Sequence, residues 1–62
     1  MNLTNKEAYL AMCHFLEGFY ERTGSDDVGA LLGGMRLIAD EETMDSAAWQ
    51  DWIQSIQLVK KI

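Results

Sequence analysis

The residues of this chain that could take part in covalent chemistry are few. Cys13 and His14 are the only cysteine and the only histidine among the 62 residues. A thiol nucleophile needs a base within hydrogen-bond reach, but adjacent residues of a helix point about 100° apart. No second histidine exists to act as that base. We therefore expect Cys13 to be a small residue at the edge of the core, and we predict no catalytic residue.

Two sets of side chains could instead bind a metal ion. His14 and Glu17 share a helix face and would supply two ligands, so a metal-dependent enzyme would need a second copy to complete its site. The run Asp40–Glu42 with Asp45 offers oxygen ligands for calcium, but it lacks the alternating acids, the central glycine and the final glutamate of an EF-hand loop. We expect an exposed histidine and a solvated loop, and we predict neither a metal nor another cofactor.

The strongest signal in the sequence is a concentration of acidic side chains between Ser25 and Trp52. Seven acids stand there against Arg36 alone, which gives a local charge of −6 in a chain of net charge −5. Such a field speeds encounter with a basic protein and favours specificity. The alternative interpretation is a solvated face that only confers solubility. The side chains that we predict to bind a partner are Asp26, Asp27, Asp40, Glu41, Glu42, Asp45 and Asp51.

Composition excludes several classes of protein. The hydrophobic fraction of 48% and the six aromatic residues are typical of a folded chain, so we expect residues 1–62 to form a single domain. Negative charge repels phosphate, so we predict no binding to nucleic acid. No window approaches the ~18 apolar residues of a membrane span, and no export signal is recognisable at the start. With a single cysteine as well, we expect a cytoplasmic protein that does not associate with membranes.

The segments that must position the acids carry the start signals of helices. Thr4 and Glu7 have the spacing of a capping box, which predicts a helix over residues 5–22. Asp45 can cap a third helix over residues 46–61, in which propensity, apolar spacing and terminal lysines agree. Both segments repeat apolar residues at helical spacing, so each should turn one face toward a core.

The middle of the chain gives weaker signals. Ser25 can cap a short second helix, which we expect to end at Gly33 or Gly34 because each interior glycine costs roughly 1 kcal/mol relative to alanine. Met35–Ala39 should then be extended or form a turn, and Asp40–Met44 should form a charged loop. No other stretch is typical of a strand.

Together these segments predict an all-α fold, a small three-helix bundle with two long helices and one short middle helix. The residues that we expect in its core are Phe15, Leu16, Phe19, Leu31, Leu32, Trp49, Trp52, Ile53 and Ile56.

Two motifs in the chain resemble those of a family of very small bacterial proteins. The first lies in Glu21–Gly33 and contains the string RTGSDD; the second, Asp45–Trp52, is close to DPAAWxDW. Ser46 replaces the usual proline, a substitution that the first helical position tolerates. The family resembles immunity proteins of contact-dependent and other polymorphic toxin systems. By this resemblance, Asp26, Asp27 and Asp51 belong to the shared motifs.

The resemblance implies a cytoplasmic, non-enzymatic inhibitor that binds a cognate toxin. Combined with the acidic tract, it leads to the hypothesis that this chain neutralises a basic toxin, for example a nuclease, whose substrate is a polyanion. The alternative hypothesis is a self-associating helical module, a homodimer whose small chains complete their core only together.

Overall fold

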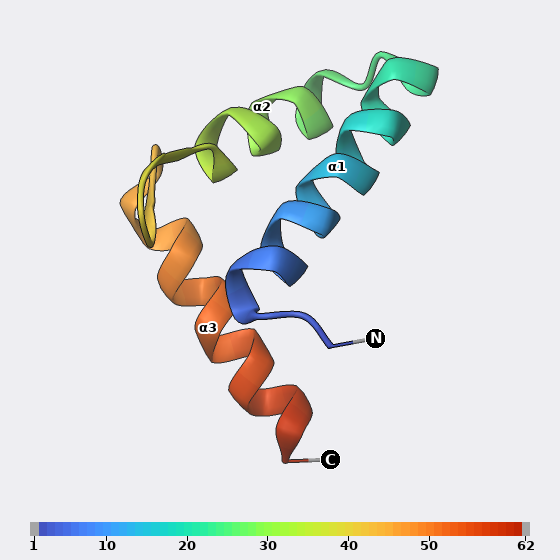
Figure 1. Ribbon diagram of the computed structural model, residues 1–62. Helices are drawn as coiled ribbons and strands as arrows, with labels where there is room; N and C mark the ends of the chain where they lie inside the picture. The colour runs from blue at the N-terminus through green and yellow to red at the C-terminus, as the bar shows by residue number, and fades with distance from the viewer. Residues whose placement is uncertain (1, 62) are drawn as a thin grey trace.

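The computed structural model describes residues 2–61 as three helices and a small β-hairpin (Figure 1). Helix α1 spans Asn5–Thr23, α2 spans Asp26–Met35 and α3 spans Ser46–Lys60; strands β1 (Leu37–Ala39) and β2 (Glu42–Thr43) connect α2 to α3. The predicted number of helices and the short middle helix are confirmed. Their ends differ by one or two residues from the predicted bounds, with α2 continuing past both glycines.

A small β-hairpin adds to the all-α prediction, and its first strand lies within Met35–Ala39, which was expected to be extended or to form a turn. Strand β1 pairs with β2 in an antiparallel arrangement that sets Leu37 opposite Thr43, so the expected loop Asp40–Met44 includes a strand. A further backbone hydrogen bond of 2.8 Å, from the N–H of Met44 to the carbonyl of Arg36, closes the base of the hairpin. A two-residue strand has no alternating apolar pattern, so its presence could not be read from residue types.

The predicted helix starts are confirmed. Glu7 donates its backbone N–H to the hydroxyl of Thr4 at 3.0 Å, and the N–H of Thr4 donates to the carboxylate of Glu7 at 2.9 Å. The side chains of Ser25 and Asp45 accept from the first turns of α2 and α3. Between α1 and α2, Gly24 has a φ of 63°, a left-handed conformation that glycine adopts without steric cost.

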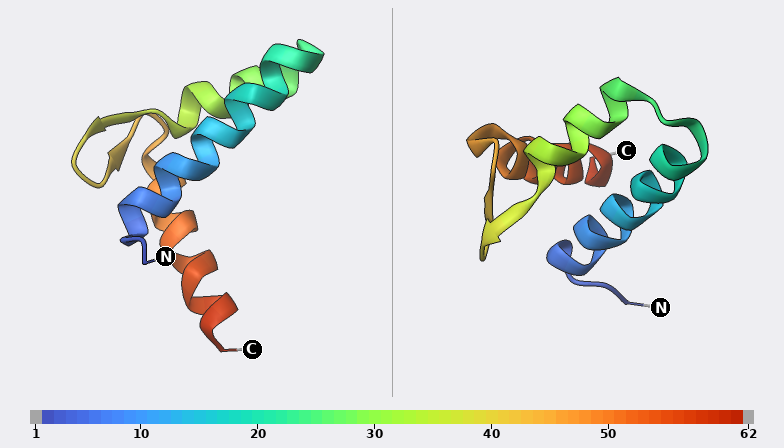
Figure 2. Two further views of the ribbon diagram at one scale, coloured as in Figure 1. Left: turned by 45° about the vertical axis from the view of Figure 1, so that its right-hand side comes forward. Right: turned by 90° about the horizontal axis from the view of Figure 1, so that it is seen from above.

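The helices form an open arrangement rather than a closed bundle. In both figures α1 and α2 lie side by side, while α3 leads away from the hairpin and passes the start of α1 (Figures 1 and 2). The Cα radius of gyration is 12.3 Å, whereas a compact chain of this length has ~10.6 Å. Within residues 2–61 no helix has the length and apolar character needed to cross a bilayer.

The buried core is centred on Tyr9, which is 1% exposed. Its ring contacts Trp49 and Trp52 edge-on, with centroids 5.2 and 5.5 Å away, and its hydroxyl donates to the carbonyl of Met35. The core prediction is confirmed for Trp49, and three other predicted residues are partly buried against this cluster: Leu16, Trp52 and Ile53.

The rest of the predicted core is largely wrong. Phe15, Phe19 and Leu31 are exposed, with 70% of Phe15 accessible to solvent. The apolar stripe of α1 is broad enough to face two directions, and the helix turns the edge with Tyr9 and Cys13 inward. The phenylalanines consequently lie on the other edge of the stripe, which the chain itself does not cover. Leu32 and Ile56 are intermediate in burial.

Candidate functional site

The thiol and the imidazole near the middle of α1 do not form a reactive pair. Cys13 is partly buried against the core, whereas His14 is exposed. Burial raises the pKa of the Cys13 thiol, and the negative charge of Glu17 raises it further. The thiolate fraction at neutral pH is therefore small. In the part of the chain that the structure describes, no group of three or more histidine, cysteine, aspartate or glutamate side chains could hold a metal ion.

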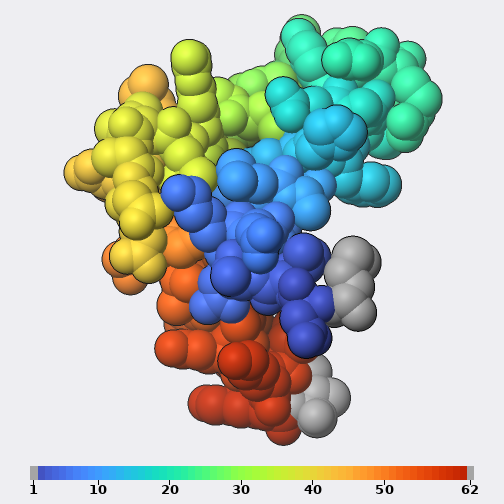
Figure 3. Space-filling view, in the orientation of Figure 1, coloured from blue at the N-terminus to red at the C-terminus, as the bar shows by residue number. Residues whose placement is uncertain are grey.

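Three of the predicted partner-binding residues lie at the tip of the hairpin. Asp40, Glu41 and Glu42, here named the hairpin acids, are exposed and belong to the segment that projects at the yellow edge of Figure 3. Glu41 occupies the turn with a φ of 59°, a conformation that is uncommon for a residue other than glycine. Among residues 2–61, neither glutamate has an ion-pair partner.

Asp40 is tied to α1 by an ion pair. Its carboxylate lies 2.8 Å from the ammonium of Lys6, and the two side chains are 78% and 48% exposed. Exposed pairs of this kind contribute about 0–1 kcal/mol, so a partner could displace Lys6 at little cost. The strand pairing and the base of the hairpin hold the backbone, while the carboxylates face water. The hairpin acids are thus presented on a supported turn rather than on a long loose loop.

The other predicted residues lie elsewhere. Asp26 and Asp27 are in the first turn of α2, at the end of that helix far from the hairpin (Figure 1). The ten residues of α2 span about 15 Å at 1.5 Å per residue, which separates the two acidic groups. One carboxylate oxygen of Asp45 accepts a hydrogen bond of 3.0 Å from the backbone N–H of Ala47. The acidic tract of the sequence is therefore divided in space, with Asp51 further along α3.

An apolar surface that the sequence did not predict runs between α1, α2 and α3. Two adjoining cavities of about 410 and 330 Å³ meet at Trp52 and Ser55, which line both. We name this surface the apolar groove. Its apolar and aromatic lining residues are Leu3, Ala8, Tyr9, Met12, Leu16, Leu31, Met35, Ala48, Trp52, Ile56 and Val59.

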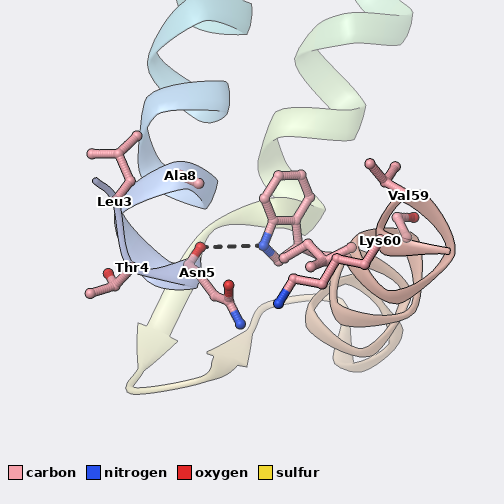
Figure 4. Close-up of a pocket in the computed structure, with 9 residues that line it drawn as sticks. Leu3, Thr4, Asn5, Ala8, Val59 and Lys60 are labelled. Atoms are coloured by element: carbon pink, nitrogen blue, oxygen red, sulfur yellow. Dashed lines mark hydrogen bonds between the residues drawn. The ribbon is translucent and has the colours of Figure 1, made fainter. Parts of the chain in front are cut away.

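Figure 4 shows the end of the apolar groove that lies between α1 and α3. Leu3 and Ala8 stand on one side, and Val59 stands on the other. Trp52 also lines this cavity. The indole N–H donates to the backbone carbonyl of Asn5 at 3.3 Å (dashed line). This hydrogen bond ties α3 to the first turn of α1 and fixes the orientation of the ring.

The charged groups of the apolar groove lie at its two ends. Lys60 lines the cavity shown in Figure 4, whereas Asp45 and Asp51 line the other cavity, nearer the start of α3. Helical spacing places Ala8 and Trp52 on apolar stripes, which was visible in the sequence. Part of each stripe packs against the core, and Trp52 is itself partly buried there. Which part stays accessible depends on the angle between α1 and α3, for which the sequence carries no local signal.

Comparisons with known proteins identify no relative. A scan against protein-family models found no match, and searches of curated proteins and of solved structures found none either. The motif resemblance accordingly stays a prediction.

Proposed function

We propose that this chain is a non-enzymatic binding protein that recognises a basic partner protein through the hairpin acids. The observation that carries the proposal is the presentation of three consecutive carboxylates on a supported turn, of which only Asp40 has an ion-pair partner within residues 2–61. Asp45 has a local structural use as a helix cap, whereas Glu41 and Glu42 have none of this kind.

The negative charge of the hairpin acids would speed the association of this chain with a basic protein. Opposite charges on two proteins raise association rates from about 10⁵–10⁶ toward 10⁸–10⁹ M⁻¹s⁻¹ at low salt, and they disfavour partners of the wrong sign. The net charge of −5 adds a long-range field of the same sign. Polyanions such as nucleic acids would be repelled, so a basic protein fits this surface best.

The partner that we propose is a bacterial toxin with a basic surface, and the chain would act as its immunity protein in the cytoplasm. The support is the resemblance of the two motifs to small immunity proteins. A nuclease toxin would suit the charges well, because its active site binds a polyanion that clustered carboxylates can imitate. Asp26 and Asp27 would then form a second, separate contact or serve only the helix dipole of α2.

The test is co-expression with the C-terminal domain of the protein encoded by the adjacent gene. The two chains should copurify as a complex. Changing Glu41→Lys and Glu42→Lys should slow association at low salt by at least about tenfold, as expected for lost electrostatic steering. The matched control is Glu17→Lys with Glu21→Lys, which makes the same change in net charge on exposed positions of α1.

The comparison of the two variants separates a local effect from a general one. The proposal requires the hairpin variant to associate more slowly than the α1 variant. If both variants associate at the same rate, the hairpin acids are not the docking surface. A far-ultraviolet circular dichroism spectrum of each variant verifies that the helices remain.

A further inference from the structure

One end of the apolar groove is both accessible and acidic. This end is the cavity of about 330 Å³ that α1, α2 and α3 border together, here named the aspartate end. Its base consists of the core residues Tyr9 and Met35 and of Met12 and Trp52, which pack against them. Leu31 lines the same cavity, but 53% of this residue is exposed. The aspartate end therefore has a packed base and an apolar side that is open to a further side chain.

The only charged residues that line this cavity are Asp45 and Asp51, both exposed and both contributed by the start of α3. Neither has an ion-pair partner within residues 2–61, and the basic lining residue of the groove, Lys60, belongs to the other cavity. A protein surface that covered the aspartate end would remove both carboxylates from water. Because burying an unpaired carboxylate is costly, the covering surface must supply lysine or arginine.

The walls of the groove indicate the backbone conformation of its occupant. Residues of β1 and β2 line neither cavity, so no strand edge offers hydrogen bonds to an added strand. At the aspartate end all lining residues except Asp45 belong to helices, whose interior N–H and C=O groups are already paired. An occupant must therefore pair its own backbone groups, as a helix does.

Helical geometry gives the spacing of the basic residues on that occupant. Asp45 and Asp51 are six positions apart, which is about 9 Å along α3 at 1.5 Å per residue. Residues i and i+7 of another helix lie on one face, about 10.5 Å apart along its axis. Ala48 lies between the two aspartates and is small, so a helix beside α3 can approach closely. Two basic side chains at this spacing can reach both carboxylates.

We propose that the aspartate end of the apolar groove binds an amphipathic helix of a basic partner protein. Apolar side chains of that helix contact Leu31, and its basic residues at i and i+7 pair with Asp45 and Asp51. The net charge of −5 favours the approach of such a helix and repels an anionic membrane surface. The hairpin acids do not line this site, so the inference goes beyond the proposed function and has a separate test.

Titration of the full chain with a synthetic peptide tests this proposal. The probe is a helix of about four turns with leucine at the a and d positions of its heptads, arginine at the e positions and no aromatic residue. At physiological salt it should change the tryptophan emission to saturation, because Trp52 lines the cavity. The same peptide with glutamate in place of arginine should bind at least about tenfold more weakly.

Two pairs of variants locate the binding site. Leu31→Ala should raise the dissociation constant of the arginine peptide by roughly tenfold. Leu58→Ala, which changes a similarly exposed leucine outside the groove, should leave it unchanged. Asp51→Asn should raise the constant about threefold, whereas Asp27→Asn, the same change of charge at the far end of α2, should not. Circular dichroism verifies that each variant keeps its helices.

Four results would overturn the proposal. One is a tryptophan signal that does not saturate, and another is equal binding of the peptide to the wild-type chain and to Leu31→Ala. Loss of binding in Glu41→Gln with Glu42→Gln would place the peptide on the hairpin acids instead. A wild-type chain that sediments as a dimer and becomes monomeric with Leu31→Ala would show that a second copy covers the groove. Equal association rates of the hairpin and α1 variants contradict only the proposed function and leave this test unaffected.

Discussion

Removal of one hydroxyl group tests how the core closes. Tyr9→Phe keeps the ring and its edge-on contacts with Trp49 and Trp52, but it deletes the hydrogen bond to the carbonyl of Met35. That carbonyl lies in the last turn of α2, where carbonyls lack a partner within the helix. Tyr9 and Met35 are 1% and 7% exposed, so water cannot readily replace the lost donor.

The expected loss can be estimated from the burial of this pair. A buried acceptor left without a donor costs about 1–3 kcal/mol in the free energy of unfolding. Unfolding entropy is ~2.1 cal/mol/K per residue near 60 °C, or roughly 130 cal/mol/K for this chain, so each kcal/mol lowers Tm by about 8 °C. Tyr9→Phe should therefore lower Tm by about 8–23 °C. Tyr9→Ala should cost ~3–5 kcal/mol and leave the chain largely unfolded.

Tyr20→Phe provides the matched control. Tyr20 is 40% exposed on the same helix, and its substitution should change the free energy of unfolding by less than about 0.5 kcal/mol. Urea and thermal denaturation followed by circular dichroism would measure both variants at one protein concentration. If Tyr9→Phe is as stable as Tyr20→Phe, the buried hydroxyl does not hold α2 against α1, and the account of the core is refuted.

Further predictions concern a buried threonine, two glycines and the response to pH. Thr43→Val should lower the free energy of unfolding by about 1–3 kcal/mol, as measured by urea denaturation. The buried hydroxyl of Thr43 accepts the backbone N–H of Trp49 at 3.2 Å and donates to the backbone carbonyl of Asp45. Gly33→Ala, where an added Cβ meets no atom within 4 Å, should stabilise the chain by up to about 1 kcal/mol. Gly34→Ala should gain less or destabilise, since its Cβ would lie 3.2 Å from the Cβ of Asp45, and comparison of the two Tm values checks this. Burial raises the pKa of Cys13 and of Tyr9 in the folded chain. The stability that these two groups contribute is therefore fully present below their ordinary pKa values. It is lost as the pH rises through their raised pKa values in the folded state. Tm should accordingly fall above about pH 9, and Cys13→Ala should reduce the first part of this fall.

The parts of the fold that depend on near neighbours in the chain were predictable. The capping box at Thr4 and the caps at Ser25 and Asp45 each involve residues at most three positions apart, so residue type and spacing suffice. Helix number and approximate bounds followed from these signals. The end of α2 was placed too early, because packing of Met35 in the core outweighs the weak helix propensity of the glycines.

The parts that depend on distant contacts were not predictable. The hairpin is a local element whose first strand was expected to be extended or a turn, but its pairing was missed because Glu41, rather than glycine or asparagine, takes the left-handed turn position. The orientation of α1 decides that Tyr9 is buried and Phe15 exposed, and both lie on one broad apolar stripe. The separation of Asp26 from the hairpin acids likewise follows from the length of α2. These acids belong to one acidic tract of the sequence, but Asp26 lies at the start of α2 and the hairpin follows its end. The apolar groove arises only where α1, α2 and α3 come together.

The ionic-strength dependence of the association rate tests whether the hairpin acids recognise a basic protein. The measurement uses stopped-flow mixing of this chain with the basic domain encoded by the adjacent gene, at salt concentrations from low to physiological. The rate for the wild-type chain should fall steeply as salt screens the charges, whereas Glu41→Lys with Glu42→Lys should associate slowly at low salt and depend weakly on salt. Equal rates and equal salt dependence for the two proteins would contradict recognition through the hairpin.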